Sequence, residues 1–249
     1  MFETGGSRMD AVLFNLTTAA LMVLVFLSAR TVVGVETIMK RRIPWFAAGL
    51  TSVAVAGLVT QVCWSGAMDL FDADPAKSGW WRIVTSVFMQ NGGPVGDAYN
   101  LLTLAVIAAL AEWFWSGPLM LALFAGGIFL PQLVDTLFGA TGGSTDPRNF
   151  AGSSGATYFL GATLAAALLL RSRVVKERLL GASVPVFGLV LWFAQENGHG
   201  LVAAYGFVLG GVVWLVGRRL LDPERDLTRA PRRTVGSVAA IVRKPRAGV

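Results

Sequence analysis

The sequence predicts an all-α polytopic membrane protein, and three observations lead to that fold class. Hydrophobic residues make up 54% of the 249 residues, charged residues only 14%, and the mean hydropathy is +0.61. Soluble domains carry about 25% charged residues and could not bury this much apolar surface. The apolar residues also gather into stretches of roughly 20, the length that a helix needs to cross a bilayer. We therefore expect lipid to be the solvent of this chain.

Seven such stretches follow one another along the chain. Their ranges are 11–33, 43–64, 98–115, 117–139, 154–171, 181–195 and 198–217, and the sixth is the shortest. The first is too long for a signal peptide, and no basic segment precedes it. We predict three parts: an extra N-terminal helix with its basic linker (1–42), a six-helix core with a long outer loop at 64–97 (43–217), and a basic, disordered cytoplasmic tail (218–249).

Basic residues predict the orientation of these helices. Of the 21 Lys and Arg residues, 17 lie in the linker after the first span, the linker after the fifth, and the tail. Seven spans place all three segments on one side, and basic loops face the cytoplasm. We therefore expect a multi-pass protein of the cell membrane, with its N-terminus outside and its C-terminus in the cytoplasm.

Cysteine and histidine each occur once, as Cys63 and His199. A single cysteine forms no intramolecular disulfide, and a zinc site of the usual kind needs more such ligands. We expect no metal, no cofactor and no nucleic-acid partner. The expected partners are the bilayer and other transmembrane proteins, and the sequence leaves the oligomeric state open.

One segment that could carry chemistry opens the fifth span with Gly152-Ser153-Ser154-Gly155. It follows an outer loop rich in glycine and polar residues at 140–153. A serine at a helix N-terminus lies beside unpaired N–H groups and the positive end of the helix dipole. Both would stabilise an oxyanion. Small residues that only pack transmembrane helices are the alternative.

His199 opens the seventh span, and the predicted topology places it at the same outer face as Ser154. Ionisable residues at membrane depth are usually functional. An imidazole there could take the proton of a serine hydroxyl. A histidine at the membrane surface without a role is the alternative, but the shared depth of the two residues favours catalysis.

The outer loop at 64–97 is long and rich in tryptophan and glycine, and long loops usually have a functional reason. It contains Trp81-Arg82, and Asn100 follows as the third span begins. A side-chain amide near the membrane needs a partner or a ligand. Glu112, at the inner end of the same span, is more simply explained by a structural bond.

In this order, the motifs resemble the rhomboid family of intramembrane serine proteases, over residues 43–217. That family carries Gly-x-Ser-Gly with a nucleophilic serine, and Gly152-Ser153-Ser154-Gly155 matches it. An aromatic residue four positions later supports the family's catalytic histidine, and Tyr158 matches that position.

The other motifs agree with the resemblance in part. Trp81-Arg82 matches a motif of the family's first outer loop, and Glu112 matches an acidic residue at the inner end of the next helix. Asn100 matches the oxyanion asparagine of His-x-x-x-Asn, but Gly96 replaces the histidine. The extra helix stands before the core, whereas family members more often carry it after the core.

The histidine helix allows two registers against the family pattern Ala-His-x-x-Gly-x-x-x-Gly. If His199 is the catalytic residue, Gly206 is the second glycine and Val202 replaces the first. If Gly206 and Gly210 are the two glycines, the histidine position falls on Ala203. We favour the first register because Asn-Gly precedes His199 and the chain has no other histidine.

The resemblance implies a Ser154–His199 dyad that cleaves client transmembrane helices, with Asn100 and the Ser154 backbone N–H as the oxyanion hole. Clients are expected to arrive beside the sixth span, past Phe187, Trp192 and Phe193. One alternative is a pseudoprotease that binds clients without cleaving them. The other is a small transporter, for which Asp135 in the fourth span is the best candidate residue.

Overall fold

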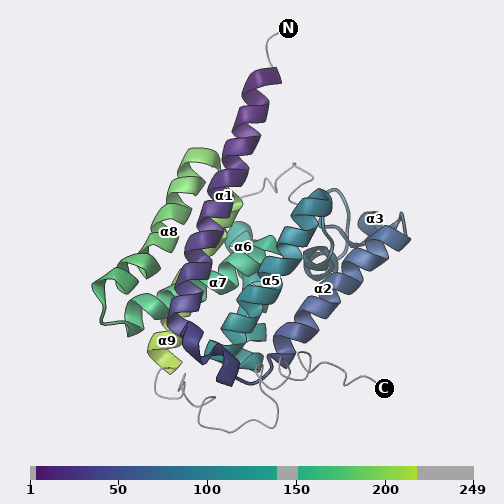
Figure 1. Ribbon diagram of the computed structural model, residues 1–249. Coiled ribbons are helices and arrows are strands. Elements are labelled where there is room, and N and C mark those ends of the chain that lie inside the picture. The colour runs from purple at the N-terminus through teal and green to yellow at the C-terminus, as the bar shows by residue number, and fades with distance from the viewer. Residues whose placement is uncertain (1–3, 139–150, 218–249) are drawn as a thin grey trace, which may run out of the picture.

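A computed structural model describes residues 4–138 and 151–217 of the chain. The outer loop expected around 140–153 lies mostly outside this part, and the tail at 218–249 lies wholly outside it. The described residues form seven long helices, namely α1 (Thr4–Val33), α2 (Trp45–Cys63), α5 (Gly93–Trp115), α6 (Gly117–Phe138), α7 (Ser154–Arg171), α8 (Val175–Gln195) and α9 (Gly198–Gly217) (Figure 1).

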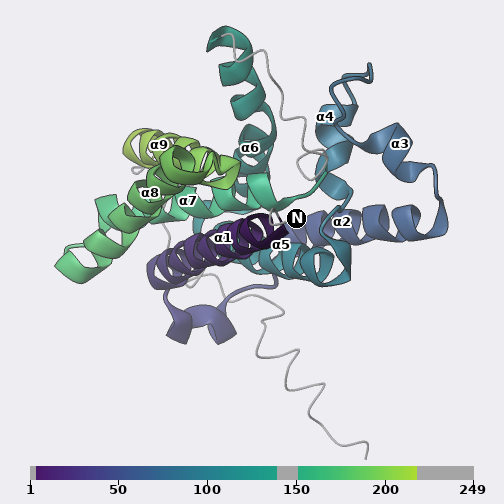
Figure 2. The same cartoon turned by 90° about the horizontal axis from the view of Figure 1, so that it is seen from above.

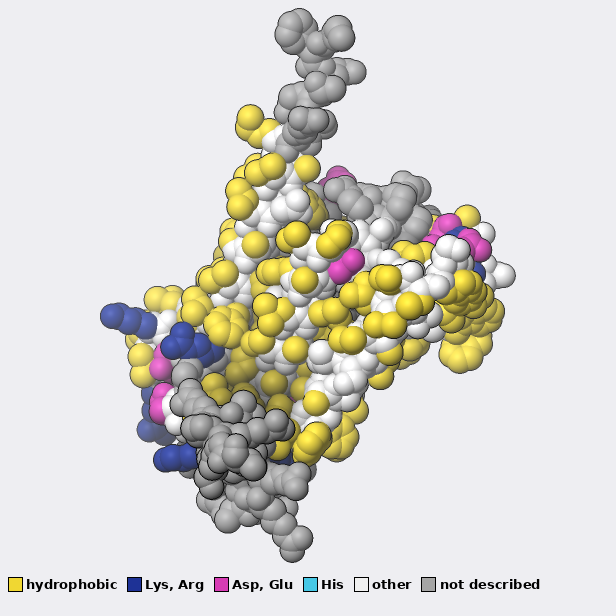
Figure 3. Space-filling view, turned by 45° about the vertical axis from the view of Figure 1, so that its right-hand side comes forward, with side chains coloured by type: hydrophobic (Ala, Val, Ile, Leu, Met, Phe, Trp, Pro, Cys, Tyr) yellow, Lys and Arg dark blue, Asp and Glu magenta, His cyan; other side chains and the backbone are white. Residues whose placement is uncertain are grey.

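Each of the seven helices is long and apolar enough to span a membrane. The prediction of an all-α polytopic membrane protein with seven spans is therefore confirmed for the described part of the chain. Figure 3 shows the matching surface, an apolar band over the middle of the molecule with Lys and Arg side chains gathered at one end.

Two helices begin earlier than the hydropathy predicted. α5 begins at Gly93 instead of 98, and α8 begins at Val175 instead of 181. The prediction that the sixth span is the shortest was wrong, because α8 has 21 residues and α7 only 18. Charged residues such as Lys176 and Glu177 form the first turn of α8, and a hydropathy pattern does not mark a turn that lies outside the apolar layer.

The outer loop consequently ends at 92 rather than 97, and it is folded. It contains α3 (Ala67–Phe71), α4 (Arg82–Thr85) and the 3-10 helix η2 (Ser86–Phe88). The loop lies close against α2 at Gly57. A Cβ on that glycine would collide with the carbonyl oxygen of Phe88. The side-chain amide of Gln61 on α2 also donates to the carbonyl of Gln90, at 2.7 Å.

α7 is the central helix of the bundle. It packs against α9, α1, α8, α6 and α5, and its residues from Ala156 to Leu168 are all buried. α1 lies between α8 and α5 in both views and covers α7 on that side (Figures 1 and 2). The N-terminal helix is therefore integrated into the bundle and does not stand apart from the six-helix core.

At the basic end of the bundle, buried hydrogen bonds join α1, α2 and α5. A short 3-10 helix, η1 (Val35–Lys40), connects α1 to α2, and the Arg41 side chain donates to the carbonyls of Val33 and Trp113. Glu112 accepts the backbone N–H of Ala47 at 2.7 Å. This bond caps the N-terminus of α2, so Glu112 has the structural role that the sequence favoured.

Candidate active site

The structure places Ser154 at the first position of α7, next to a turn that requires glycine. Gly152 has φ of +137°, a conformation that side chains rarely adopt. Its N–H donates to the carbonyl of Ser86 at 3.0 Å, which ties the turn to the outer loop. Ser153 and Ser154 follow in helical conformation, so Ser154 lies where the α7 N–H groups are unpaired. A Cβ on Gly155 would meet nothing within 4 Å, so that glycine makes no close backbone contact.

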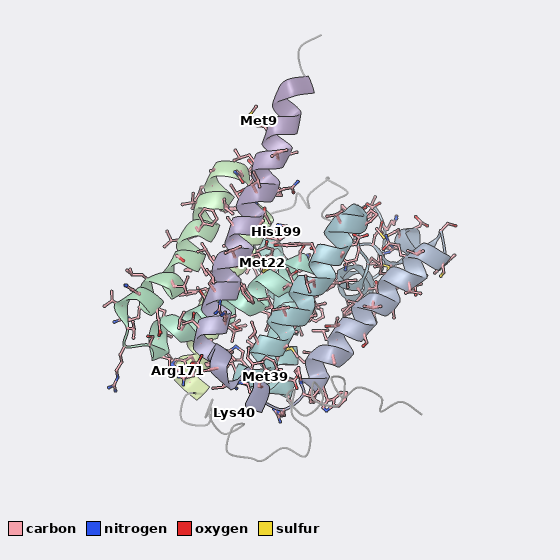
Figure 4. All side chains as sticks on the ribbon, viewed as in Figure 1. Met9, Met22, Met39, Lys40, Arg171 and His199 are labelled. Atoms are coloured by element: carbon pink, nitrogen blue, oxygen red, sulfur yellow. The ribbon has the colours of Figure 1, made fainter. Side chains whose placement is uncertain are left out.

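His199 approaches Ser154 from α9. Glu196 ends α8 in the left-handed conformation, and the chain reverses through Asn197 into α9. The His199 Nε2 atom lies 2.9 Å from Ser154 Oγ, across 45 residues of sequence. Figure 4 shows His199 in the upper half of the view, away from the basic end marked by Lys40 and Arg171. The sequence-predicted pair is therefore within hydrogen-bond distance.

The two registers of the histidine helix are distinguished by the side chain that contacts Ser154, not by the glycines that pack α9 on α7. Both Gly206 and Gly210 lie so close to α7 that a Cβ on either would collide with it. The glycines alone therefore fit both registers. Ala203 is fully buried, and the residue whose side chain contacts Ser154 is His199. The geometry thus corresponds to the register with His199 and Gly206.

Tyr158 holds the imidazole on its other side. Its ring lies one turn after Ser154, with its centroid 4.9 Å from that of His199 in an edge-on arrangement. Its hydroxyl donates to the carbonyl of Thr18 on α1, at 2.7 Å. The extra N-terminal helix therefore contacts the residue that positions the histidine.

Asn100 of α5 lies near Ser154, across Gly152. A Cβ added to Gly152 would lie 3.8 Å from both Asn100 Nδ2 and Ser154 Oγ, so the amide and the hydroxyl flank the same glycine. The Nδ2 group donates one hydrogen bond, at 3.0 Å, to Gln90 Oε1. An NH₂ group carries two N–H donors, so this bond uses one of them. Gly96 leaves open space, since a Cβ there would meet nothing within 4 Å.

Gln90 was not singled out by the sequence analysis, yet it is fully buried beside Asn100. Its backbone N–H donates to Gln61 Oε1, and its carbonyl accepts from Gln61 Nε2. Its own Nε2 has no hydrogen-bond partner among the residues that the structure describes. Buried amides are normally satisfied, so Gln90 stands out as a donor held ready beside the site.

Trp81 and Arg82 lie in the outer loop, and neither contacts Ser154 or His199. Arg82 donates to the carbonyls of Ser78 and Asp69 and to the carboxylate of Asp72. Lys77 joins the same cluster, and its hydrogen bond to Asp69 lowers the pKa of that exposed carboxyl. The bonds of Arg82 and Lys77 therefore join residues within the loop.

α1 packs against one side of α8, the helix beside which the access route was expected. The Thr17 hydroxyl of α1 donates to Gln195 at 2.9 Å, near the outer end of α8. Phe187 packs against the core, whereas Phe193 is 81% exposed.

α1 and α5 leave a groove of about 230 Å³ between them, lined by Met22, Val23, Phe26, Tyr99, Leu102 and Val106. Asp135, the residue considered for a transporter, is exposed at the end of α6.

No family model, no curated protein and no solved structure matches this chain. The site must therefore be judged by its own geometry. It consists of a hydroxyl in contact with an imidazole, a side-chain amide beside the hydroxyl, and a helix N-terminus under it. Such a combination could supply a nucleophile, a general base and oxyanion donors, the groups that acyl transfer needs.

Proposed function

We propose that the chain is a rhomboid-type intramembrane serine endopeptidase that cleaves transmembrane segments of other membrane proteins. The observation that carries the proposal is the 2.9 Å contact between His199 Nε2 and Ser154 Oγ. The order of the motifs along the chain supports the rhomboid assignment. The orientation, with N-terminus outside and C-terminus cytoplasmic, is part of the proposal and is supported by the basic end of the bundle.

In the proposed reaction, Ser154 Oγ attacks the carbonyl carbon of a client peptide bond while its proton passes to His199 Nε2. The resulting oxyanion accepts hydrogen bonds from Asn100 Nδ2 and from the Ser154 backbone N–H. The C–N bond then breaks, and His199 returns the proton to the leaving amine. A water molecule, deprotonated by the same imidazole, hydrolyses the acyl-enzyme and restores Ser154.

The groove between α1 and α5 is the client route that we propose, in place of the route beside α8. The occupant is an apolar transmembrane segment, because the lining side chains are almost all apolar. Tyr99 lines the groove and interacts with Tyr158, whose ring contacts His199. A segment seated there would reach the dyad through Tyr99 and Tyr158.

Gly96 is the observation that favours a second candidate function. A rhomboid-like protein without the usual oxyanion histidine could bind clients and leave them intact. Removing one oxyanion donor costs about 10²–10³ in rate. Slow cleavage and no cleavage are therefore the outcomes that distinguish the protease from the pseudoprotease.

The test uses the full-length chain reconstituted in lipid vesicles with a single-pass transmembrane substrate. Ser154→Ala and His199→Ala are measured beside the wild type. We expect cleavage by the wild type and its loss in both variants. Cleavage that survives either substitution would refute the dyad. Crosslinking of the client without any product would instead support the pseudoprotease.

A further inference from the structure

Asn197 lies beside His199 on the side away from Ser154, where a third residue of the site would lie. Neither the motifs nor the resemblance assigned it a role. Its side chain is fully buried in the turn between α8 and α9. Its Oδ1 atom lies 3.2 Å from His199 Nδ1, the ring nitrogen that faces away from Ser154. Its Nδ2 group donates to Thr18 Oγ1 on α1, at 2.7 Å.

Hydrogen bonds link Phe14 to Thr18, Thr18 to Asn197 and Asn197 to His199, and the direction of each follows from the one before it. The Thr18 hydroxyl donates its only proton to the carbonyl of Phe14, at 2.7 Å. Thr18 Oγ1 must therefore accept from its other neighbour, and this requires the NH₂ group of Asn197. The carbonyl oxygen of the Asn197 amide then faces His199.

A second bond gives the same amide orientation independently. The backbone N–H of His199 donates to Asn197 Oδ1 at 3.0 Å, and an NH₂ group could not accept it. Because Oδ1 is only an acceptor, the neutral imidazole must carry its proton on Nδ1. Nε2 is then the unprotonated nitrogen, which is the form that a base for Ser154 requires.

We propose that Asn197, anchored by Thr18 of the extra helix, is a positioning residue that selects the Nδ1–H tautomer of His199. The proposal rests on the proposed function for its effect on catalysis, but the tautomer itself exists without any substrate. It also assigns α1 a role, since the helix supplies both the anchor for Asn197 and the carbonyl that holds Tyr158.

A purely structural role for Asn197 must be separated from this one, because its Oδ1 also caps the N-terminus of α9. Asn197→Ser is the discriminating variant, since serine caps helices about as well as asparagine but is too short to reach both partners. Thr18→Val removes the anchor hydroxyl and keeps the backbone carbonyl that Tyr158 uses. Thr17→Val is the matched control, because the Thr17 hydroxyl bonds to Gln195 and not to Asn197.

The experiment exploits the single histidine of the chain, since ¹⁵N-histidine labelling reports His199 alone. Nitrogen NMR of the full-length protein in detergent, at a pH where the imidazole is neutral, shows which ring nitrogen carries the proton. We expect Nδ1–H in the wild type and in Thr17→Val. We expect a mixture of tautomers in Asn197→Ser and Thr18→Val, with kcat lowered about tenfold or more by loss of one hydrogen bond.

Two results would overturn the inference: an Nε2–H tautomer in the wild type, or an Asn197→Ser variant with unchanged tautomer and kcat. Thermal unfolding of each variant shows that any change does not come from misfolding. If the wild type has the Nδ1–H tautomer and Asn197→Ser loses it, but the wild type cleaves no substrate, the proposed function fails and the role of Asn197 stands. The two failures are therefore distinguishable.

Discussion

Gly206 of α9 lies directly against the carbonyl oxygen of Phe159 in α7, so closely that a Cβ on Gly206 would collide with it. Small residues allow transmembrane helices to approach in this way. Ser154 begins α7 five residues before Phe159, and His199 lies seven residues before Gly206. The contact therefore sets the spacing and the relative depth of the two helices, and through them the distance between hydroxyl and imidazole.

We expect Gly206→Ala to destabilise the protein by about 1–3 kcal/mol, because the added methyl forces α9 away from α7. Cleavage should fall together with stability, as His199 moves away from Ser154. Thermal unfolding in detergent and the vesicle cleavage assay measure the two effects. Gly211→Ala on the same helix is the control, since its Cβ would lie 3.8 Å from the nearest atom, in ordinary contact. Equal stability of the two variants would contradict this account.

Asn100→Ala should lower kcat by about 10²–10³ and leave KM nearly unchanged, because an oxyanion donor acts in the transition state. Gln90→Leu should cause a smaller loss of kcat, since it removes the acceptor that orients Asn100. Steady-state cleavage over a range of substrate concentrations separates the two parameters. An Asn100→Ala variant with the kcat of the wild type would exclude Asn100 from the oxyanion hole.

Gly96→His should raise kcat by about tenfold or more, because it restores a donor near the oxyanion. The position lies in the first turns of α5, and a Cβ there meets nothing within 4 Å, so the larger side chain has room. Cleavage rates of the variant and the wild type at saturating substrate provide the measurement. An unchanged or lower kcat in a stably folded variant would argue that Gly96 is not an oxyanion position.

Filling the groove between α1 and α5 should weaken client binding. Val23→Trp places a large side chain at its wall and should raise KM severalfold, with little change in the labelling of Ser154 by a small fluorophosphonate. Val190→Trp on α8 is the matched control, because Val23 and Val190 are both 54% exposed. If Val190→Trp raises KM and Val23→Trp does not, clients reach the site beside α8.

Arg82→Ala should loosen the outer loop without unfolding the bundle. The guanidinium joins Ser78, Asp69 and Asp72, and both Arg82 and Asp72 have 12% exposed side chains. Loss of a partly buried charge partner costs about 1–3 kcal/mol, which corresponds to amide exchange about 5- to 150-fold faster in the loop. Lys77→Met is the milder control, because Lys77 is more exposed. Unchanged exchange in Arg82→Ala would refute the bracing role.

The number and order of the helices could be read from the sequence, because a membrane imposes a length and an apolarity on every span. Ser154 and His199 could be chosen as a pair for the same reason, since topology places both at one face. The first residues of α5 and α8 could not be predicted as well from the sequence. Their extra turns are built from glycine or charged residues, which hydropathy assigns to loops although helical hydrogen bonds continue through them.

Only the tertiary structure brought α1 to the site. Apolarity predicts that a helix lies in the bilayer, but it carries no information on which neighbour the helix contacts. The bonds of Thr18 to Asn197 and to Tyr158 join residues 140 or more positions apart, and no local pattern marks such partners. Gln90 was missed for the same reason, since its burial beside Asn100 depends on how the outer loop packs on α2. The sequence by itself therefore determined the membrane fold and the choice of Ser154 and His199 as a candidate pair, whereas the packing of α1 and the loop decided which side chains surround them.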